Sequence, residues 1–424
     1  MIFRPASFIC AVLLSVSAQC WAAPLTLQEC LQKARENNQA LKSAAWDTRL
    51  AQENLRLATS SDYPRIDAQA GYSMQLAPQA VIISGRTAET QEPDYAFAGL
   101  SANYTLYDFG RRDSRKQQAL SATDAAVQTF ESKRSDVALK TIETWFGILE
   151  TGKLIDAASE EVTQVTEHRR VAQALFEEGV VTRNDVLQAD VRLAAARQKL
   201  LTLRNRRENS WLFLNFLTGS EPGFRAELDE KSTLAPDQVS DKDLLSIILK
   251  RHDIQALQYG TVASEAEVAE SRSSFFPELY SRLALDYVQN DKVREQAIMS
   301  ATVGIKFNLF DGYASTSIRE KAIKNRSRLQ DTLKLAQQQA LFEIDSARND
   351  AAVSKERIGV AESSIRQSEE NLRINQERYR ERVGTATEVL DAQTLVTQSK
   401  TDYHQAYYEY QVAVARLKRA IGEL

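Results

Sequence analysis

The residues with the clearest chemical potential are acids in two short segments of similar sequence. The segments are VTRNDVLQAD at 181–190 and GTATEVLDAQ at 384–393, and in each a threonine is followed three positions later by an acid. This spacing is typical of a capping box, in which the two side chains satisfy backbone N–H groups at a helix start. Glu388 and Asp391 are also three residues apart and therefore share a helix face. The sequence thus predicts two helix starts, one of which presents a pair of carboxylates.

Other reactive groups lack the spacing that catalysis or metal binding needs. His168, His252 and His404 are scattered, and the sequence has no Gly-rich phosphate loop, no nucleophile elbow and no cysteine pair for a metal. We therefore predict a protein that is not an enzyme and has no cofactor or bound metal. A net charge of −4 with interspersed acids and bases gives no reason to expect nucleic acid as a partner.

The N-terminus has the layout of a secretory signal peptide. Residues 1–22 contain Arg4, an apolar stretch and small residues before a predicted cleavage after Ala22, although cleavage after Ala18 stays open. Only Cys30 would remain in the mature chain, and a lone thiol on an amphipathic helix is typically a small buried hydrophobe.

The two acidic segments belong to a tandem duplication. An offset of 203 residues pairs Thr182 with Thr385, and pairs LYD at 106–108 with LFD at 309–311. Upstream the offset is 213, so a ten-residue difference lies between Pro64 and the first LYD. We predict a first repeat at 23–217 (helix, β-hairpin, long helix, helix), an inter-repeat linker at 218–240 and a second repeat at 241–424.

Long helices follow the LYD and LFD motifs. Each motif precedes some 65–70 residues without proline, and a helix of that size is roughly 100 Å long. The helix after the second tip has a seven-residue repeat, typical of coiled-coil packing. Its apolar positions are Val389, Val396, Tyr403, Tyr410 and Leu417. An ordinary antiparallel coiled coil is the alternative interpretation.

Four stretches alternate between apolar and polar residues, which predicts β-strands. They lie at 66–76, 98–106, 283–287 and 301–309, and their length of about ten residues suits a strand that crosses a membrane. A soluble two-layer sheet is the alternative. A sheet in lipid must close, and four strands cannot close alone. Two copies would supply eight strands and three would supply twelve, of which only the wider barrel leaves a convincing lumen.

In their order, these motifs resemble the TolC-like family of outer-membrane efflux and secretion channels. The resemblance rests on LTLQECLQKARENNQALKSA at the start, the proline-led strands YPRIDAQAGY and FPELYSRLALDY, the motifs LYDFG and LFDG that close each hairpin, and the two tips. It implies an α+β homotrimer in which twelve shared strands form an outer-membrane pore. Twelve helical columns would continue that pore as a tunnel across the periplasm of a Gram-negative bacterium.

The resemblance also implies partners and a function. The tunnel would dock on a periplasmic adaptor joined to an inner-membrane pump, either ABC-type or proton-driven, and would export proteins or small molecules. The loop at 77–94 would be extracellular, and the linker would lie in a belt around the middle of the tube. Arg111, Arg112, Arg115 and Lys116 could contact anionic lipid or form a solvated basic patch. The alternatives are a secreted or periplasmic coiled-coil structural or adhesion protein without a pore, and a soluble binding protein.

Site residues follow from the same resemblance. Glu388 and Asp391 would line the constriction, where a ring of six carboxylates would attract cations, and Asp185 would take part in bonds that hold it closed. Tyr379 matches an aromatic residue of the family's gate. Gly384 occupies the position of the family's gating arginine, so Arg183 or Arg382 are the candidate substitutes. Helix capping for the acids and plain packing for Tyr379 are the alternatives.

The two tips are the predicted adaptor contacts. They read EEGVV at 177–181 and RVGT at 382–385. The contact residues predicted there are Gly179, Val180, Val181, Val383, Gly384 and Thr385. The alternative is that these residues are ordinary turns.

Overall fold

The computed structural model describes residues 24–235 and 244–424, so the predicted signal peptide and the end of the predicted linker lie outside the described residues. The first repeat consists of α1 (Leu27–Asn37), α2 (Gln39–Ser60), β1 (Arg65–Met74), β2 (Ala80–Ile83), β3 (Arg86–Glu89), β4 (Asp94–Tyr107), α3 (Arg111–Glu177) and α4 (Arg183–Thr218). The second consists of α5 (Leu244–Lys250), α6 (His252–Ser273), β5 (Glu278–Val288), β6 (Ala297–Lys306), α7 (Ala314–Arg380) and α8 (Ala386–Ile421).

The duplication is visible in the element lengths. Helices α3 and α7 have 67 residues each, and α4 and α8 have 36 each. The offset of 203 residues maps α3 onto α7 and α4 onto α8 from first residue to last. Helices α4 and α8 each end at a glycine in the left-handed conformation, Gly219 and Gly422, where a side chain would strain the backbone.

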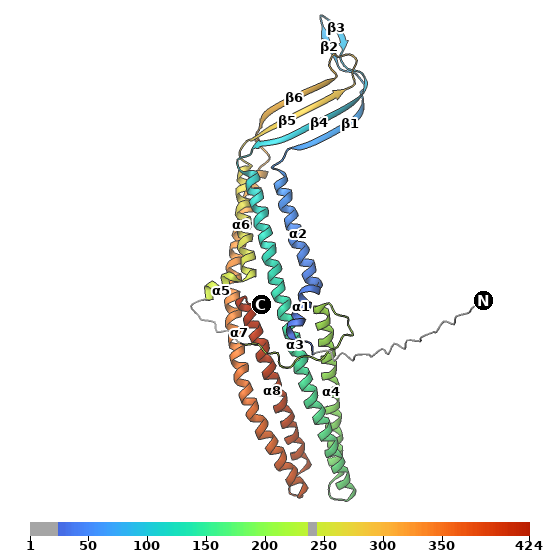
Figure 1. The fold of residues 1–424 in the computed structure, drawn as a ribbon, viewed down its shortest axis with the longest axis vertical. Helices are drawn as coiled ribbons and strands as arrows, with labels where there is room; N and C mark the ends of the chain where they lie inside the picture. The colour runs from blue at the N-terminus through green and yellow to red at the C-terminus, as the bar shows by residue number, and fades with distance from the viewer. Residues whose placement is uncertain (1–23, 236–243) are drawn as a thin grey trace, which may run out of the picture.

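The molecule is elongated, with the sheet at one end and two helical hairpins at the other (Figure 1). Helices α3 and α4 form the first hairpin, and α7 and α8 form the second. Helix α3 also packs against α2, α6 and α8, and so connects the two halves. Each described helix falls short of the combination of length and apolar character that crossing a membrane requires.

The four long strands form one antiparallel sheet in the order β1-β4-β5-β6. Its register places Leu100 opposite both Ala68 and Leu285, and Leu285 opposite Met299. Leu100, Leu285 and Met299 are 49%, 48% and 79% exposed, so one face of the sheet carries a continuous uncovered apolar surface. The alternation predicted from the sequence is therefore confirmed.

The segment 77–94 differs from the plain loop that we predicted. It contains a second, two-stranded sheet, β2–β3, which projects beyond the main sheet (Figure 1). Ser84 and Gly85 at its turn both have positive φ, of 52° and 81°, as a two-residue hairpin turn requires. The β-branched residues Val81, Ile82 and Ile83 favour the strand that precedes the turn.

The main apolar core lies near the middle of the helices. Trp145, Phe146 and Trp211 are almost fully buried there, together with Cys30 and Leu228. Burial raises the pKa of the Cys30 thiol to about 12, which agrees with its predicted role as a small buried hydrophobe.

The described part of the predicted linker packs against this core. Leu228 forms a backbone bridge with Leu25, and the backbone N–H of Leu234 donates to the Gln411 side chain of α8 at 2.7 Å. The linker thus crosses the helices at mid-length (Figure 1).

Three of the four basic residues singled out at the start of α3 are paired with neighbouring acids. Arg112 contacts Asp108 at 3.1 Å, and Arg115 contacts Glu270 of α6 at 2.6 Å. Lys116 is 3.2 Å from Asp62. The contact with lipid stays a prediction.

An equivalent contact occurs once in each repeat. It joins the residue that precedes α2 or α6 to the C-terminal end of α4 or α8. In the first repeat the Asn38 amide caps α2 and donates to the Leu217 carbonyl at 2.9 Å. In the second repeat the equivalent residue, Arg251, donates to the Ala420 carbonyl at 3.1 Å. The duplication therefore preserved a contact while the residue type changed.

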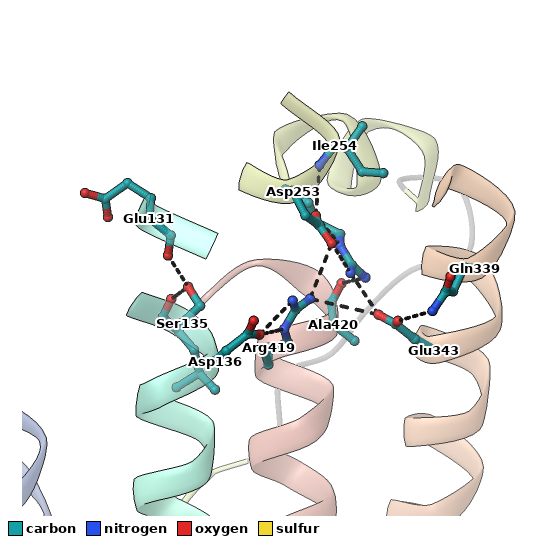
Figure 2. Close-up of polar contacts among 11 residues, drawn as sticks. Glu131, Ser135, Asp136, Asp253, Ile254, Gln339, Glu343, Arg419 and Ala420 are labelled. Carbon is teal, nitrogen blue, oxygen red and sulfur yellow. Dashed lines mark hydrogen bonds and ion pairs between the residues drawn. The ribbon is translucent and has the colours of Figure 1, made fainter. Parts of the chain in front are cut away.

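Arg251 also belongs to a charged network that ties α6, α7, α8 and α3 together. Figure 2 shows Asp253, Glu343, Arg419 and Asp136 of this network. Only 3% of the Arg251 side chain is exposed, and it pairs with Asp253 at 2.7 Å and Glu343 at 2.8 Å. Arg419 of α8 extends the network to Asp136 of α3 at 2.8 Å. These contacts hold the second hairpin to the rest of the chain.

We expect Arg251→Gln to destabilise the protein by about 1–3 kcal/mol, because the half-buried carboxylates of Asp253 and Glu343 lose their shortest ion pairs and the Ala420 carbonyl loses a donor. Thermal unfolding in detergent, followed by circular dichroism, should show a lower midpoint. Arg373→Gln is the control, since Arg373 pairs with exposed Glu370 and Glu377 and should matter little. Equal midpoints for the two variants would contradict this role of Arg251.

The register of the main sheet also predicts which of its two faces contacts lipid. Leu285→Arg should reduce the amount of folded protein in the outer membrane, because an arginine facing the bilayer centre costs about 2–4 kcal/mol. Ser300→Arg is the matched control, since Ser300 lies on the opposite face, across from Ala284. Equal loss with both variants, measured in purified outer membranes, would refute the face assignment.

Candidate gate at the helical tips

The two turns that end the helical hairpins lie next to each other at the end remote from the sheet (Figure 1). In the first turn Gly179 has φ +73° and the Val180 N–H donates to the Leu175 carbonyl at 2.8 Å. In the second turn the equivalent left-handed position is held by Arg382, at φ +65°. Gly384 instead permits a close approach, because a Cβ there would lie 3.1 Å from Arg378 Cβ.

Both predicted capping boxes are present. The Asp185 carboxylate accepts from the Thr182 N–H at 2.9 Å, and the Glu388 carboxylate accepts from the Thr385 N–H at 2.9 Å. The bond from the Thr385 backbone is the main cause that lowers the pKa of Glu388. Capping is therefore a role that both acids fill, whatever else they do.

Direct contacts join the two tips within one chain. The Thr387 hydroxyl of α8 donates to the Gln188 side chain of α4 at 3.3 Å, and Arg192 of α4 approaches Asp391 of α8 at 3.5 Å. These residues line a groove between α4 and α8. Above them, Gln393 of α8 contacts Gln164 of α3. The second tip is thus tied to the first by polar groups.

The cations that face the candidate acids differ from those that the sequence suggested. Glu388 is 3.7 Å from Arg378, and Asp391 is paired with Arg192. Arg183 and Arg382 are exposed at the turns, and within the described ranges neither forms an ion pair with these acids. Sequence reasoning missed Arg378 and Arg192, although Arg378 lies only ten residues before Glu388.

Tyr379 links the gate candidates to the helix interior. Its ring packs against the apolar cluster of Leu372, Val389, Ala392 and Val396, so the packing alternative is also fulfilled. Its ring lies 5.7 Å from that of His168 on α3. Burial raises the pKa of Tyr379, and the Asp185 carboxylate acts in the same direction. A gate role for Tyr379 and Asp185 stays a prediction.

The predicted adaptor contacts lie at the surface of the tips. Val383 is 73% exposed and Val180 is 40% exposed, and the two are equivalent in the duplication. Each turn thus exposes one valine among charged residues.

A comparison with protein families decides what this arrangement is. The sequence profile of the family described as outer membrane efflux protein matches residues 30–220 and again 245–423, one match for each repeat. The chain belongs to the outer membrane efflux protein family. Family members are efflux channels rather than enzymes, which agrees with the prediction from the sequence.

Individual relatives agree with this assignment. The chain is 22% identical to the outer membrane protein TolC of Vibrio cholerae over 98% of this chain and 94% of that protein. It is 26% identical to the toluene efflux pump outer membrane protein TtgC of Pseudomonas putida, over 60% of this chain and 52% of that relative. This second match thus spans only about half of TtgC.

Solved structures show the same fold. The CmeC outer membrane channel of Campylobacter jejuni superposes with a TM-score of 0.84 at 19% identity, over 94% of this chain and 85% of CmeC. The predicted fold of the chain is confirmed: an α+β membrane chain with a duplicated unit, whose four strands are continued by long helices. This outer membrane efflux protein resides in the outer membrane and extends into the periplasm. The comparisons favour a channel over the coiled-coil adhesion alternative.

Proposed function

We propose that three copies of this chain form an export channel that is closed where the helical tips meet. The observation that carries the proposal is the pair of contacts between the tips, Thr387 with Gln188 and Arg192 with Asp391. The other contacts that hold the two hairpins together lie farther from the tips. Parting the two contacts at the tips would move α8 away from α4 and widen the end of the tube.

Two acids at the start of α8 give the proposed gate its charge. Asp391 and Glu388 keep 64% and 43% of their side chains exposed, so both remain accessible to ions in this arrangement. Three copies would place six such carboxylates around the narrow end. A ring of carboxylates attracts cations and hinders anions. The closed channel should therefore conduct weakly and prefer cations.

The exposed valines support docking on a periplasmic adaptor. Val180 and Val383 occur once in each repeat, so three chains would present six similar apolar tips. An adaptor assembly with matching pockets could bind all of them in one ring. The name of the P. putida relative, a toluene efflux pump protein, supports pairing with an inner-membrane pump. We infer that this pump is an ABC or proton-driven transporter and that the channel serves efflux or type I secretion.

The double variant Glu388→Gln/Asp391→Asn should lose the cation preference of the pore. Glutamine at 388 can still complete the capping box, so this change removes charge and leaves the helix start intact. Single-channel recording in planar bilayers, with a salt gradient, measures the preference as a reversal potential. We expect that potential to fall towards zero.

Glu177→Gln/Glu178→Gln is the matched control, because it removes the same charge from the first turn. It should leave the reversal potential near that of the unaltered protein. If the reversal potential is unchanged in the Glu388→Gln/Asp391→Asn variant, those acids act only as helix caps and do not set the selectivity. Folded protein that gives no conductance at all would refute the channel.

Val180→Asp/Val383→Asp should weaken adaptor binding and leave conductance unchanged. A buried unpaired carboxylate at each tip would oppose docking, while the pore itself would keep its charges and contacts. Binding of a purified periplasmic adaptor that recognises the unaltered protein, measured by surface plasmon resonance, should fall at least about ten-fold, equivalent to ~1.4 kcal/mol. Binding equal to that of the unaltered protein would remove the tips from the docking surface.

A further inference from the structure

His168 of α3 is a buried titratable residue that the proposed gate does not yet use. It is 7% exposed, and its Nε2 atom is buried without a hydrogen-bond partner among the described residues. In the sequence it is one of three scattered histidines. Its position, fourteen residues before the Thr182 capping box, places it inside the tip region.

His168 faces groups from the other hairpin elements. Tyr379 of α7 lies against it, with ring centroids 5.7 Å apart, and the Tyr379 hydroxyl is likewise buried without a partner in the described part of the chain. Asp185, at the start of α4, is close enough to influence both rings. One turn earlier on α3, Gln164 contacts Gln393 of α8.

The charged neighbours of His168 on α3 are already engaged. Glu167 pairs with Arg170 at 2.7 Å, and Arg169 pairs with Asp190 of α4 at 2.7 Å. Asp185 itself accepts the Thr182 N–H in the capping box. A proton gained by His168 would thus add a positive charge to a buried site whose nearest carboxylate is already bonded.

We propose that His168 is a proton-sensing gating residue: when it gains a proton, the α7–α8 tip separates from α3 and α4. The proposal rests on the gate proposed above and deepens it by adding a regulator. In the joined arrangement the neutral imidazole packs against Tyr379 inside the tip. In a separated arrangement the imidazolium would be hydrated, which removes the cost of burying its charge.

The direction of the pH effect follows from linkage. Burial lowers the pKa of His168 in the joined arrangement, and Asp185 opposes this shift without cancelling it. A histidine exposed by separation would titrate near its ordinary pKa of about 6.5. The joined state is therefore favoured fully above that value and loses stability as pH falls from about 6.5 towards the lowered pKa. Acid should therefore open the channel. Each unit by which the pKa of His168 differs between the joined and separated states corresponds to about a ten-fold change in the open fraction.

The experiment is single-channel recording of the full protein in planar bilayers, from about pH 7.5 to about pH 5, the range in which histidine titrates. The open probability of the unaltered channel should rise as the pH falls through this range. His168→Gln should stay closed and lose most of that rise. His168→Arg, which remains charged at all these pH values, should be open already at about pH 7.5.

His404→Gln is the matched control, since burial also lowers the pKa of His404, on α8. It should keep the full acid response. Recording in the Glu388→Gln background removes the direct effect of protonating that acid on ion selectivity and leaves the Arg192–Asp391 contact in place. The acid response should persist there as well.

Three results would overturn the proposal. They are an open probability that falls in acid, an acid response that survives in His168→Gln, and a His168→Gln channel that is open at every pH because the residue is merely structural. Each still leaves a conducting channel, so the proposed function stands. Absence of conductance in the unaltered, folded protein would instead refute the channel itself.

Discussion

The constraint on which the structure depends is that a sheet in a membrane cannot keep an open edge. The main sheet has β1 at one edge and β6 at the other, and both would leave unsatisfied backbone groups in lipid. Sharing strands between copies satisfies them and forces a ring. Because β4 leads into α3 and β6 leads into α7 at the same end of the sheet, a ring of strands becomes a tube of helices. The duplication then supplies two helical hairpins for every chain.

Stability and movement are separated along this tube. At mid-length, the apolar core around Trp145 is buried, and so is the Arg251 side chain, whose network of ion pairs connects four helices. At the tips, contacts such as Arg192 with Asp391 are partly exposed, and exposed ion pairs stabilise little. The tips can therefore part while the middle remains intact. Low local stability is expected in elements that move during function.

Much of this architecture could be predicted from the sequence because it depends on periodic patterns. The offset of 203 residues, the alternating strands and the capping boxes at Thr182 and Thr385 each repeat a local rule. The β2–β3 hairpin was missed, since its turn is Ser-Gly and its strands have four residues each. Arg378, Arg192 and His168 were also missed. Their importance comes from which helices lie side by side, and no spacing within one helix indicates that.

Cross-linking the two tips tests most directly whether their joining closes the channel. Gln188→Cys/Thr387→Cys places thiols at the contact between α4 and α8, while the native Cys30 is buried far away in the core. A short, cleavable thiol cross-linker would then be added to the purified protein in a planar bilayer. If joined tips close the channel, bridged channels should stay closed in acid and should open again in acid once the linker is cleaved. Bridged channels that open as freely as unbridged ones would contradict it.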